Sequence, residues 1–436
     1  MSPEMMTLLM LFGVLIGVFL GFPIAFTLGG MGLLFGLTFW GPQTIALLSA
    51  KAFSVYNNYT YVAIPLFIFM GTMLDASGVA DTAFGVLNQW LKKFKGGLAV
   101  GTIILCTMFA ACTGVVGASV TAMGLLALPP MIRRGYKHSL ACGVVCAGGS
   151  LGILIPPSIM LVLFGPMANV SVVKLFSAAI IPGLGLSALY IVYVIIYTRL
   201  KKDAIVEPAG LHEQEVHYSI ADGIKAFLPF LFLVFMVLGL ILFGVCAPTE
   251  AAAAGSLGAI FLALAYRRLT REVLVNAGVS SLKISAMVMF IATGANIFTS
   301  VFFGVGGNRV MTKFFMSLDI GPWGTLMAVL GLVFVLGMLI DWVGILLIVI
   351  PIFMPILNLL GFDTLWSSMM IIVMLQTSFL TPPFAHALFY IRGVAPPEVS
   401  TASIYRGAIP FILLILFMLL LMAIFPGITT WLPSRL

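Results

Sequence analysis

Charge is what this sequence has least of. Charged residues make up 8% of the 436 residues, whereas hydrophobic residues make up 62%. A soluble domain is about half apolar and about a quarter charged. Apolar runs of membrane-spanning length recur from one end of the chain to the other. The composition therefore predicts an all-α integral membrane protein and argues against a β-barrel.

Residues that carry out chemistry are also scarce. The five cysteines form no CxxC pair, the four histidines are scattered, and no GxxxxGK[ST] loop occurs. The cysteines lie within apolar runs, where cysteine acts as a small hydrophobic residue. Without a phosphate-binding loop, ATP is not expected to drive this chain directly. The sequence therefore predicts a protein that is not an enzyme and that has no bound cofactor.

The net charge of +7 is concentrated in short clusters at the ends of apolar runs. Loops rich in lysine and arginine face the cytoplasm in membrane proteins. The clusters thus predict the cytoplasmic loops of a protein that is embedded in the lipid bilayer. They do not indicate a nucleic-acid partner. They are KKFK (92–95), RRGYK (133–137), RLKK (199–202) and RRLTR (267–271).

An internal repeat divides the chain. Pro156-Pro157 recurs as Pro382-Pro383, 226 residues later, and PIAFTLGG (23–30) resembles PTEAAAAG (248–255) at nearly the same offset. The loops at 92–95 and 133–137 are basic, whereas their counterparts around 305–323 and 358–366 carry little net charge. This swap predicts two repeats of inverted topology. We expect them at residues 1–198 and 226–436, joined by a cytoplasmic linker at 199–225.

Each repeat is expected to hold a re-entrant hairpin. Residues 97–130 lie between two basic loops that should both be cytoplasmic, so this segment enters and leaves on one side. Its turn is expected near Gly114–Ser119, and the counterpart hairpin at 324–357 should turn near 338–345. Non-helical backbone at that depth must be buried in protein or line a watery cavity.

Each half is then expected to hold five full spans besides its hairpin. Inverted topology requires an odd number of full spans in each half, and five is odd. One span in each half is broken by its proline pair, at 139–165 and at 366–391. Both chain termini come out periplasmic. The other expected spans are 5–21, 24–40, 60–76, 174–198, 226–244, 250–266, 283–303 and 406–432.

The proline pairs indicate what the two helix breaks could bind. Proline ends a helix and leaves backbone carbonyls unpaired, and inverted repeats with discontinuous helices are typical of secondary transporters. We expect GASVT (117–121) to face GGSLGILIPP (148–157), and LIDWVG (339–344) to face QTSFLTPP (376–383). Neutral oxygens and carbonyls suit a hard cation such as Na⁺.

The candidate residues follow from these segments. The predicted Na⁺ contacts are Gly117, Ser119, Thr121, Gly149, Ser150, Pro156, Asp341, Gly344, Thr377, Ser378, Thr381 and Pro382. The predicted substrate contacts are Ser150, Pro157, Thr381, Pro383 and His386.

The same candidate residues could instead have purely structural roles in packing or helix capping. Serine and threonine in membrane helices also hydrogen-bond between helices, and glycine also permits close packing. An acid inside the membrane is a functional candidate, but Asp341 equally suits a cap at a hairpin tip. Glu250 is expected to cap the helix after Pro248. Arg392 is expected to reach the cytoplasmic interface.

Four motifs together resemble a known family. GASVTAMGLLALPPMIRRGY, GGSLGILIPPSI, APTEAAAAG and LTPPFAHALFYIRGVAPP are similar to the large membrane subunit of tripartite ATP-independent periplasmic (TRAP) transporters, the DctM-like type. The resemblance covers essentially the whole chain. It implies Na⁺-driven uptake across a bacterial inner membrane by an elevator mechanism, in the wider ion-transporter superfamily.

The resemblance also implies partners and a substrate class. The family works with a small four-helix membrane subunit (DctQ-like) and a periplasmic solute-binding protein (DctP-like), and most of its substrates are organic acids. Many members follow the second TPP with a VGxNLF-like run, whereas this chain has FAHALFYIRGVAPP. That run resembles the branch linked with 2-oxo acids, lactate and other monocarboxylates.

Three other functions are alternatives to a binding-protein-dependent transporter. A stand-alone Na⁺/dicarboxylate symporter would share the hairpins and would need no binding protein. An intramembrane transferase would need a cluster of acids or a His/Asp set, which the sequence lacks. An ion channel would favour an oligomeric pore over a duplicated core with broken helices.

Overall fold

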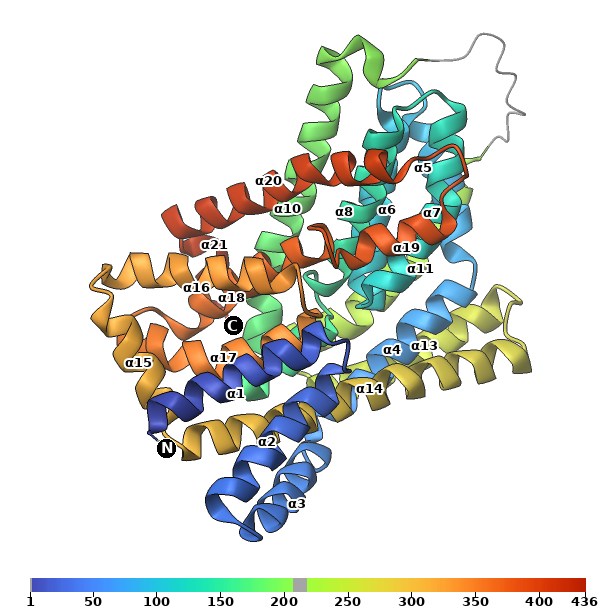
Figure 1. Ribbon diagram of the computed structural model, residues 1–436. Coiled ribbons are helices and arrows are strands. Elements are labelled where there is room, and N and C mark those ends of the chain that lie inside the picture. The colour runs from blue at the N-terminus through green and yellow to red at the C-terminus, as the bar shows by residue number, and fades with distance from the viewer. Residues whose placement is uncertain (1, 207–217) are drawn as a thin grey trace.

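The computed structural model describes residues 2–206 and 218–436, and the described residues form helices and no strand. Within these described residues, eight helices are long and apolar enough to cross a membrane. Figure 1 shows two groups of helices, with α2, α3, α4, α13 and α14 along one side and α6–α8 and α16–α20 on the other. The expected all-α membrane fold with discontinuous helices is confirmed.

The first half contains ten α-helices. They are α1 (Pro3–Phe19), α2 (Ile24–Trp40), α3 (Gln43–Tyr56), α4 (Ala63–Ala76), α5 (Val79–Leu91), α6 (Gly97–Thr113), α7 (Val116–Arg133), α8 (His138–Ser150), α9 (Ile159–Ala168) and α10 (Val172–Leu200), with 3-10 turns η1 (Tyr59–Val62), η2 (Leu151–Ile153) and η3 (Lys202–Ala204).

The second half repeats the order with small differences. Its helices are α11 (Ile220–Val234), a π segment η4 (Phe235–Gly239), α12 (Leu240–Leu242), α13 (Pro248–Ala265), α14 (Arg271–Gly304), α15 (Gly307–Ser317), α16 (Gly321–Gly337), α17 (Trp342–Leu359), α18 (Thr364–Leu375), the turn η5 (Gln376–Phe379), α19 (His386–Val394), α20 (Thr401–Ile424) and α21 (Gly427–Thr430).

Several predicted boundaries need correction. The linker predicted at 199–225 ends earlier, because Ser219 and Asp222 form a capping box that starts α11 at Ile220. The span predicted at 406–432 stops at Ile424, and Pro426 precedes the separate helix α21. The central linker residues 207–217 lie outside the described residues. Segments treated as loops also contain the helices α3, α5 and α15.

The two halves contact each other in reciprocal pairs. Helix α2 packs on α14 while α13 packs on α4, α7 packs on α19 while α17 packs on α9, and α8 packs on α20 while α18 packs on α10. Each contact joins one half to the other, and each has a counterpart with the halves exchanged. This pattern supports the predicted repeat, whose boundaries stay a prediction.

Glycine makes two of these crossings possible. A Cβ on Gly407 of α20 would lie 2.1 Å from the Ser139 carbonyl oxygen of α8, and a Cβ on Gly143 would lie 2.2 Å from the Gly407 carbonyl oxygen. In the other helix group, a Cβ on Gly294 of α14 would lie 2.5 Å from the Ala25 carbonyl oxygen of α2. Small residues let membrane helices approach backbone to backbone.

Gly407→Ala is therefore expected to force α20 away from α8. Overpacking a tight contact costs about 1–3 kcal/mol, so the thermal unfolding midpoint of the purified protein in detergent should fall. Gly278→Ala on α14 is the matched control, because its Cβ would meet no atom within 4 Å. Equal midpoints for Gly407→Ala and Gly278→Ala would contradict this packing.

Candidate functional site

The first hairpin turns against the first proline break. Gly114, in the left-handed region at φ +61, ends α6, and Val115 leads directly into α7. A Cβ on Gly152 of the break would lie 3.4 Å from the Ser119 Oγ and 3.7 Å from the Val115 carbonyl oxygen, and a Cβ on Gly114 would lie 3.2 Å from the Pro157 carbonyl oxygen. The turn is thus tighter than the predicted Gly114–Ser119.

Short polar bonds organise this tip. The Ser119 and Thr113 hydroxyls lie 3.0 Å apart, and Ser119 also donates to the Val115 carbonyl at 3.1 Å. In the break, Ser150 donates to Ala147 at 2.9 Å and Ser158 donates to the Ile153 carbonyl. These hydroxyls are fully buried or nearly so. Their oxygens keep free lone pairs that can accept from a proton donor or bind a cation.

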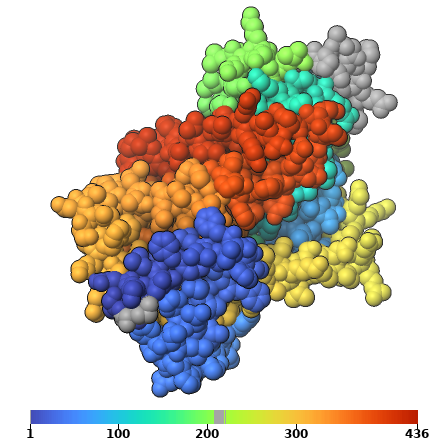
Figure 2. Space-filling model, viewed as in Figure 1, coloured from blue at the N-terminus to red at the C-terminus, as the bar shows by residue number. Residues whose placement is uncertain are grey.

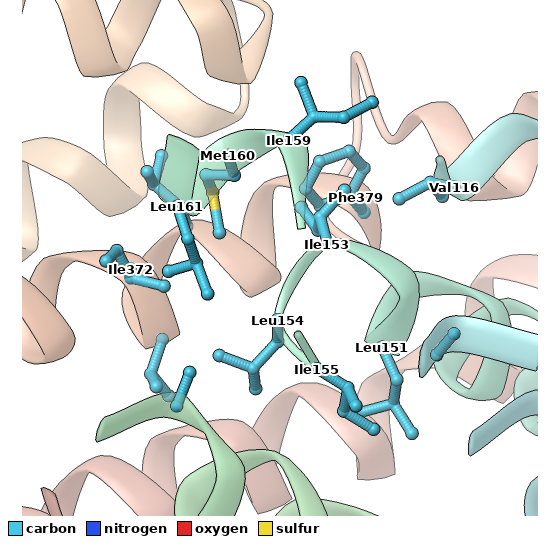
Figure 3. Packing of buried hydrophobic residues seen from close by; sticks show 14 of the residues in the cluster. Val116, Leu151, Ile153, Leu154, Ile155, Ile159, Met160, Leu161, Ile372 and Phe379 are labelled. Atoms are coloured by element: carbon cyan, nitrogen blue, oxygen red, sulfur yellow. The ribbon is translucent and has the colours of Figure 1, made fainter. Parts of the chain in front are cut away.

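The carbonyls around the first proline pair are unpaired. Within the described chain, no hydrogen bond reaches the carbonyls of Leu154, Ile155, Pro156 and Pro157. Proline supplies no N–H to pair with them. Figure 3 shows the side chains of Leu151, Leu154, Ile155 and Ile159 pointing away from the break into the apolar core. The break therefore keeps polar backbone at the centre of a dry environment.

The second hairpin and break are joined directly. The Phe384 N–H donates to the Met338 carbonyl at 3.1 Å, so the break is bonded to the hairpin tip. The His386 Nε2 lies 3.5 Å from the Asp341 Oδ1, which adds a side-chain contact. Gly337 leaves room for Ser378, because a Cβ at residue 337 would lie 2.0 Å from the Ser378 Oγ. The predicted juxtaposition of residues 339–344 with 376–383 is what the structure shows.

Unpaired polar atoms gather at the second break. Among the described residues, no hydrogen bond reaches the carbonyls of Leu380, Thr381, Pro382 and Pro383. The Ser378 Oγ and both amide atoms of the fully buried Gln376 also lack a partner. Leaving a buried polar group unpaired costs about 1–3 kcal/mol. Such a concentration of unpaired oxygens is expected where a cation binds.

Other predicted contacts have local partners. Thr377 donates to Met374 at 2.7 Å and Thr381 donates to Thr377 at 2.6 Å. Asp341 caps α17 by accepting from the Val343 N–H at 3.2 Å, so the structural alternative for Asp341 is present. Glu250 accepts from the Ala247 N–H at 2.9 Å, as a helix cap does.

Three predicted glycines have packing reasons of their own. A Cβ on Gly344 would lie 1.9 Å from Ile24 of α2, and one on Gly149 would lie 2.5 Å from Val120 of α7. Gly117 makes room for the ring of Tyr390, which would lie 2.8 Å from its Cβ. A role for these glycines in binding Na⁺ stays a prediction.

A cavity of about 560 Å³ adjoins the first hairpin tip. It lies between α4, α5 and α14 on one side and α6, α7 and α19 on the other. The space-filling view is recessed between α19 (red) and α13–α14 (yellow) (Figure 2). Thr121 lines the cavity and not the break. The other polar lining residues are Thr72, Asp75, Asp81, Thr113, Ser280 and Tyr390.

Sequence reasoning missed three residues of this region. Gln376 directly precedes the Thr377-Ser378 pair in an apolar run, and Asp75 is an acid at the end of the run 60–76. Polar residues within membrane segments are functional candidates, so both could have been found. Tyr390 gave no such signal, because tyrosine is common in apolar helices and its neighbours come from distant segments.

Comparison with known proteins then decides the family. The family model described as "Tripartite ATP-independent periplasmic transporter, DctM component" matches residues 8–428. The chain belongs to this family. It is a permease component of the multi-pass inner-membrane type, and its relatives are permeases and not enzymes.

Individual proteins agree with this. The chain is 33% identical, over 94% of each chain, to the C4-dicarboxylate TRAP transporter large permease DctM of Pseudomonas aeruginosa. It is 29% identical to the isethionate TRAP transporter permease DctMQ of Oleidesulfovibrio alaskensis, over 95% of this chain and 63% of that protein. The Alcanivorax borkumensis YdaH transporter shares the fold, with a TM-score of 0.67 and 15% identity over 98% of this chain and 99% of that one.

Ser378→Ala separates the cation role from a packing role. Removing a buried hydroxyl that has no partner should leave the protein as stable as the parent, or more stable, in Na⁺-free buffer. If Ser378 contacts Na⁺, the variant should also gain less thermal stability when Na⁺ is added.

The measurement is the unfolding midpoint as a function of Na⁺ concentration, with choline as the replacement ion. Ser317→Ala is the control, because Ser317 is exposed at the end of α15 and its hydroxyl donates to the carbonyl of Phe314 in the same helix. A Na⁺ response of Ser378→Ala equal to that of the control would rule out Ser378 as a contact.

Proposed function

We propose that this chain is the large permease of a Na⁺-coupled tripartite transporter that imports an organic acid. The observation that carries the proposal is the pair of proline breaks, whose unpaired carbonyls lie against the two hairpin tips. Unwound carbonyls in secondary transporters coordinate Na⁺. The hydroxyls of Ser119, Ser378 and Thr381 add neutral oxygens of the kind that hard cations prefer.

The mechanism we propose is an elevator movement. The hairpins, broken helices, α10 and α20 would move together against the helices α2, α4, α13 and α14. The cavity supports this, because α4, α5 and α14 line one side of it and hairpin α6–α7 lines the other, although Gly71 of α4 packs directly on Thr113 at the tip. It extends from the hairpin tip toward the end of α4 and the start of α14, where the predicted cytoplasmic clusters lie. This arrangement fits a state open to the cytoplasm.

The substrate we propose is a monocarboxylate, which includes 2-oxo acids. The lining of the cavity is largely apolar, with Ile68, Val115, Ala118, Leu125 and Ile284 among its residues, and none of its described lining residues is basic. A second carboxylate would be desolvated there without a counter-charge, which is costly. Bound Na⁺ would compensate a single negative charge.

The partners we propose are a small DctQ-like membrane subunit and a periplasmic DctP-like solute-binding protein. The family description itself is tripartite and periplasmic. The isethionate relative is longer than this chain and bears the joined name DctMQ, which supports a second permease component acting with this one.

Reconstitution tests the function. The chain, its small subunit and its binding protein in proteoliposomes with an inward Na⁺ gradient should take up labelled organic acids, and omission of any component should stop uptake. Uptake by this chain alone would instead support the stand-alone symporter. Flux without saturation would support a channel.

Replacing Pro156-Pro157 with Ala-Ala tests the break itself. Alanine restores helix propensity and backbone donors, so the carbonyls would pair within a continuous helix. Uptake should be lost, while membrane insertion and the elution volume of the purified protein should not change. Pro166→Ala, in the neighbouring helix α9, is the control, and normal uptake by the Ala-Ala variant would refute the role given to the break.

A further inference from the structure

Tyr390 lies where the hairpin tips of the two halves approach each other. It belongs to α19, four residues after His386, so both side chains lie on one face of the helix. His386 contacts Asp341 at the second tip, with 3.5 Å between Nε2 and Oδ1. The Tyr390 ring packs on Gly117 in the first turn of α7. One helix face thus touches both tips.

The position of the ring depends on Gly117. A Cβ at residue 117 would lie 2.8 Å from Tyr390 Cζ and 3.1 Å from its hydroxyl oxygen, closer than side-chain contacts normally allow. Farther along the same pair of helices, Gly124 makes room for Val394 in the same way. The absence of a side chain at 117 therefore places the phenol at the cavity.

The phenol is available for a ligand. Tyr390 lines the cavity, is 44% exposed, and within the described chain its hydroxyl has no hydrogen-bond partner. Two other hydroxyls of the lining are occupied: Thr72 donates to Ile68 at 2.9 Å, and Thr113 donates to Phe109 at 3.1 Å. Thr121, one turn along α7 from Gly117, lines the cavity and also has no partner among the described residues.

We propose that Tyr390 recognises the carboxylate of the transported acid by donating its phenolic hydrogen, with Thr121 as a second donor. The described lining of the cavity holds two acids, Asp75 and Asp81, and no basic residue, so neutral donors must orient the anion while Na⁺ balances its charge. Donors on α7 and α19 would travel with the hairpin tips. The inference rests on the proposed function and specifies how its substrate is selected.

Tyr390→Phe in the reconstituted three-component transporter tests the inference. A hydrogen bond to a charged group is strong enough for its loss to raise the KM for the acid about tenfold or more. The Na⁺ concentration for half-maximal uptake and the unfolding midpoint should stay at parental values, because the ring remains packed on Gly117. Tyr405→Phe, on α20 and outside the cavity lining, is the matched control and should keep the parental KM.

Gly117→Ala adds a second variant. It keeps the phenol but displaces it, so the KM should also rise. An unchanged KM in Tyr390→Phe, with Na⁺-driven uptake intact, would overturn the role of Tyr390 and leave the proposed function standing. An absence of Na⁺-driven uptake of any acid by the parental transporter would overturn the proposed function and this inference with it.

Discussion

Backbone carbonyls inside a membrane need a partner, and the architecture of this chain depends on that constraint. Among the described residues, the helices are interrupted at the two hairpin turns and at Pro156-Pro157 and Pro382-Pro383, and the carbonyls there need another partner. The hairpin of the same half packs on each break, with α6 and α7 on η2 and α16 on η5. Residues 150–158 and 376–381 are buried, whereas Pro382 and Pro383 are exposed. Buried oxygens without a partner are costly. Our proposal is that a bound Na⁺ supplies that partner.

The interlocking of the halves brings the two breaks and the two hairpin tips close to one another. Helix α19, which follows the second break, packs on the first hairpin, and α9, which follows the first break, packs on the second hairpin. A change at one tip therefore reaches helices of both repeats. Tyr390 and His386 lie on the face of α19 that joins the tips, beside the cavity. If Na⁺ binds at the tips and the substrate in the cavity, α19 would contact both binding regions directly.

Much of this was readable from the sequence. Charge clusters, apolar runs and the repeated proline pairs predicted both hairpins, both breaks and which tip faces which break, because these features are local or repeated. Contacts between the two halves were not predictable. The ring of Tyr390 on Gly117, the crossing of Gly143 and Gly407, and the unpaired Gln376 depend on how the halves dock. The sequence did not predict amphipathic helices such as α15, because few of their residues are buried and their apolar runs are too short to stand out.

Equilibrium binding of radioactive Na⁺ to the purified chain tests whether the two breaks hold the ion. We expect saturable binding that falls when either proline pair is replaced by alanine and disappears when both are replaced, in variants that remain monodisperse. Unchanged binding in the doubly replaced chain would mean that the ion is held elsewhere and that the breaks do not bind it.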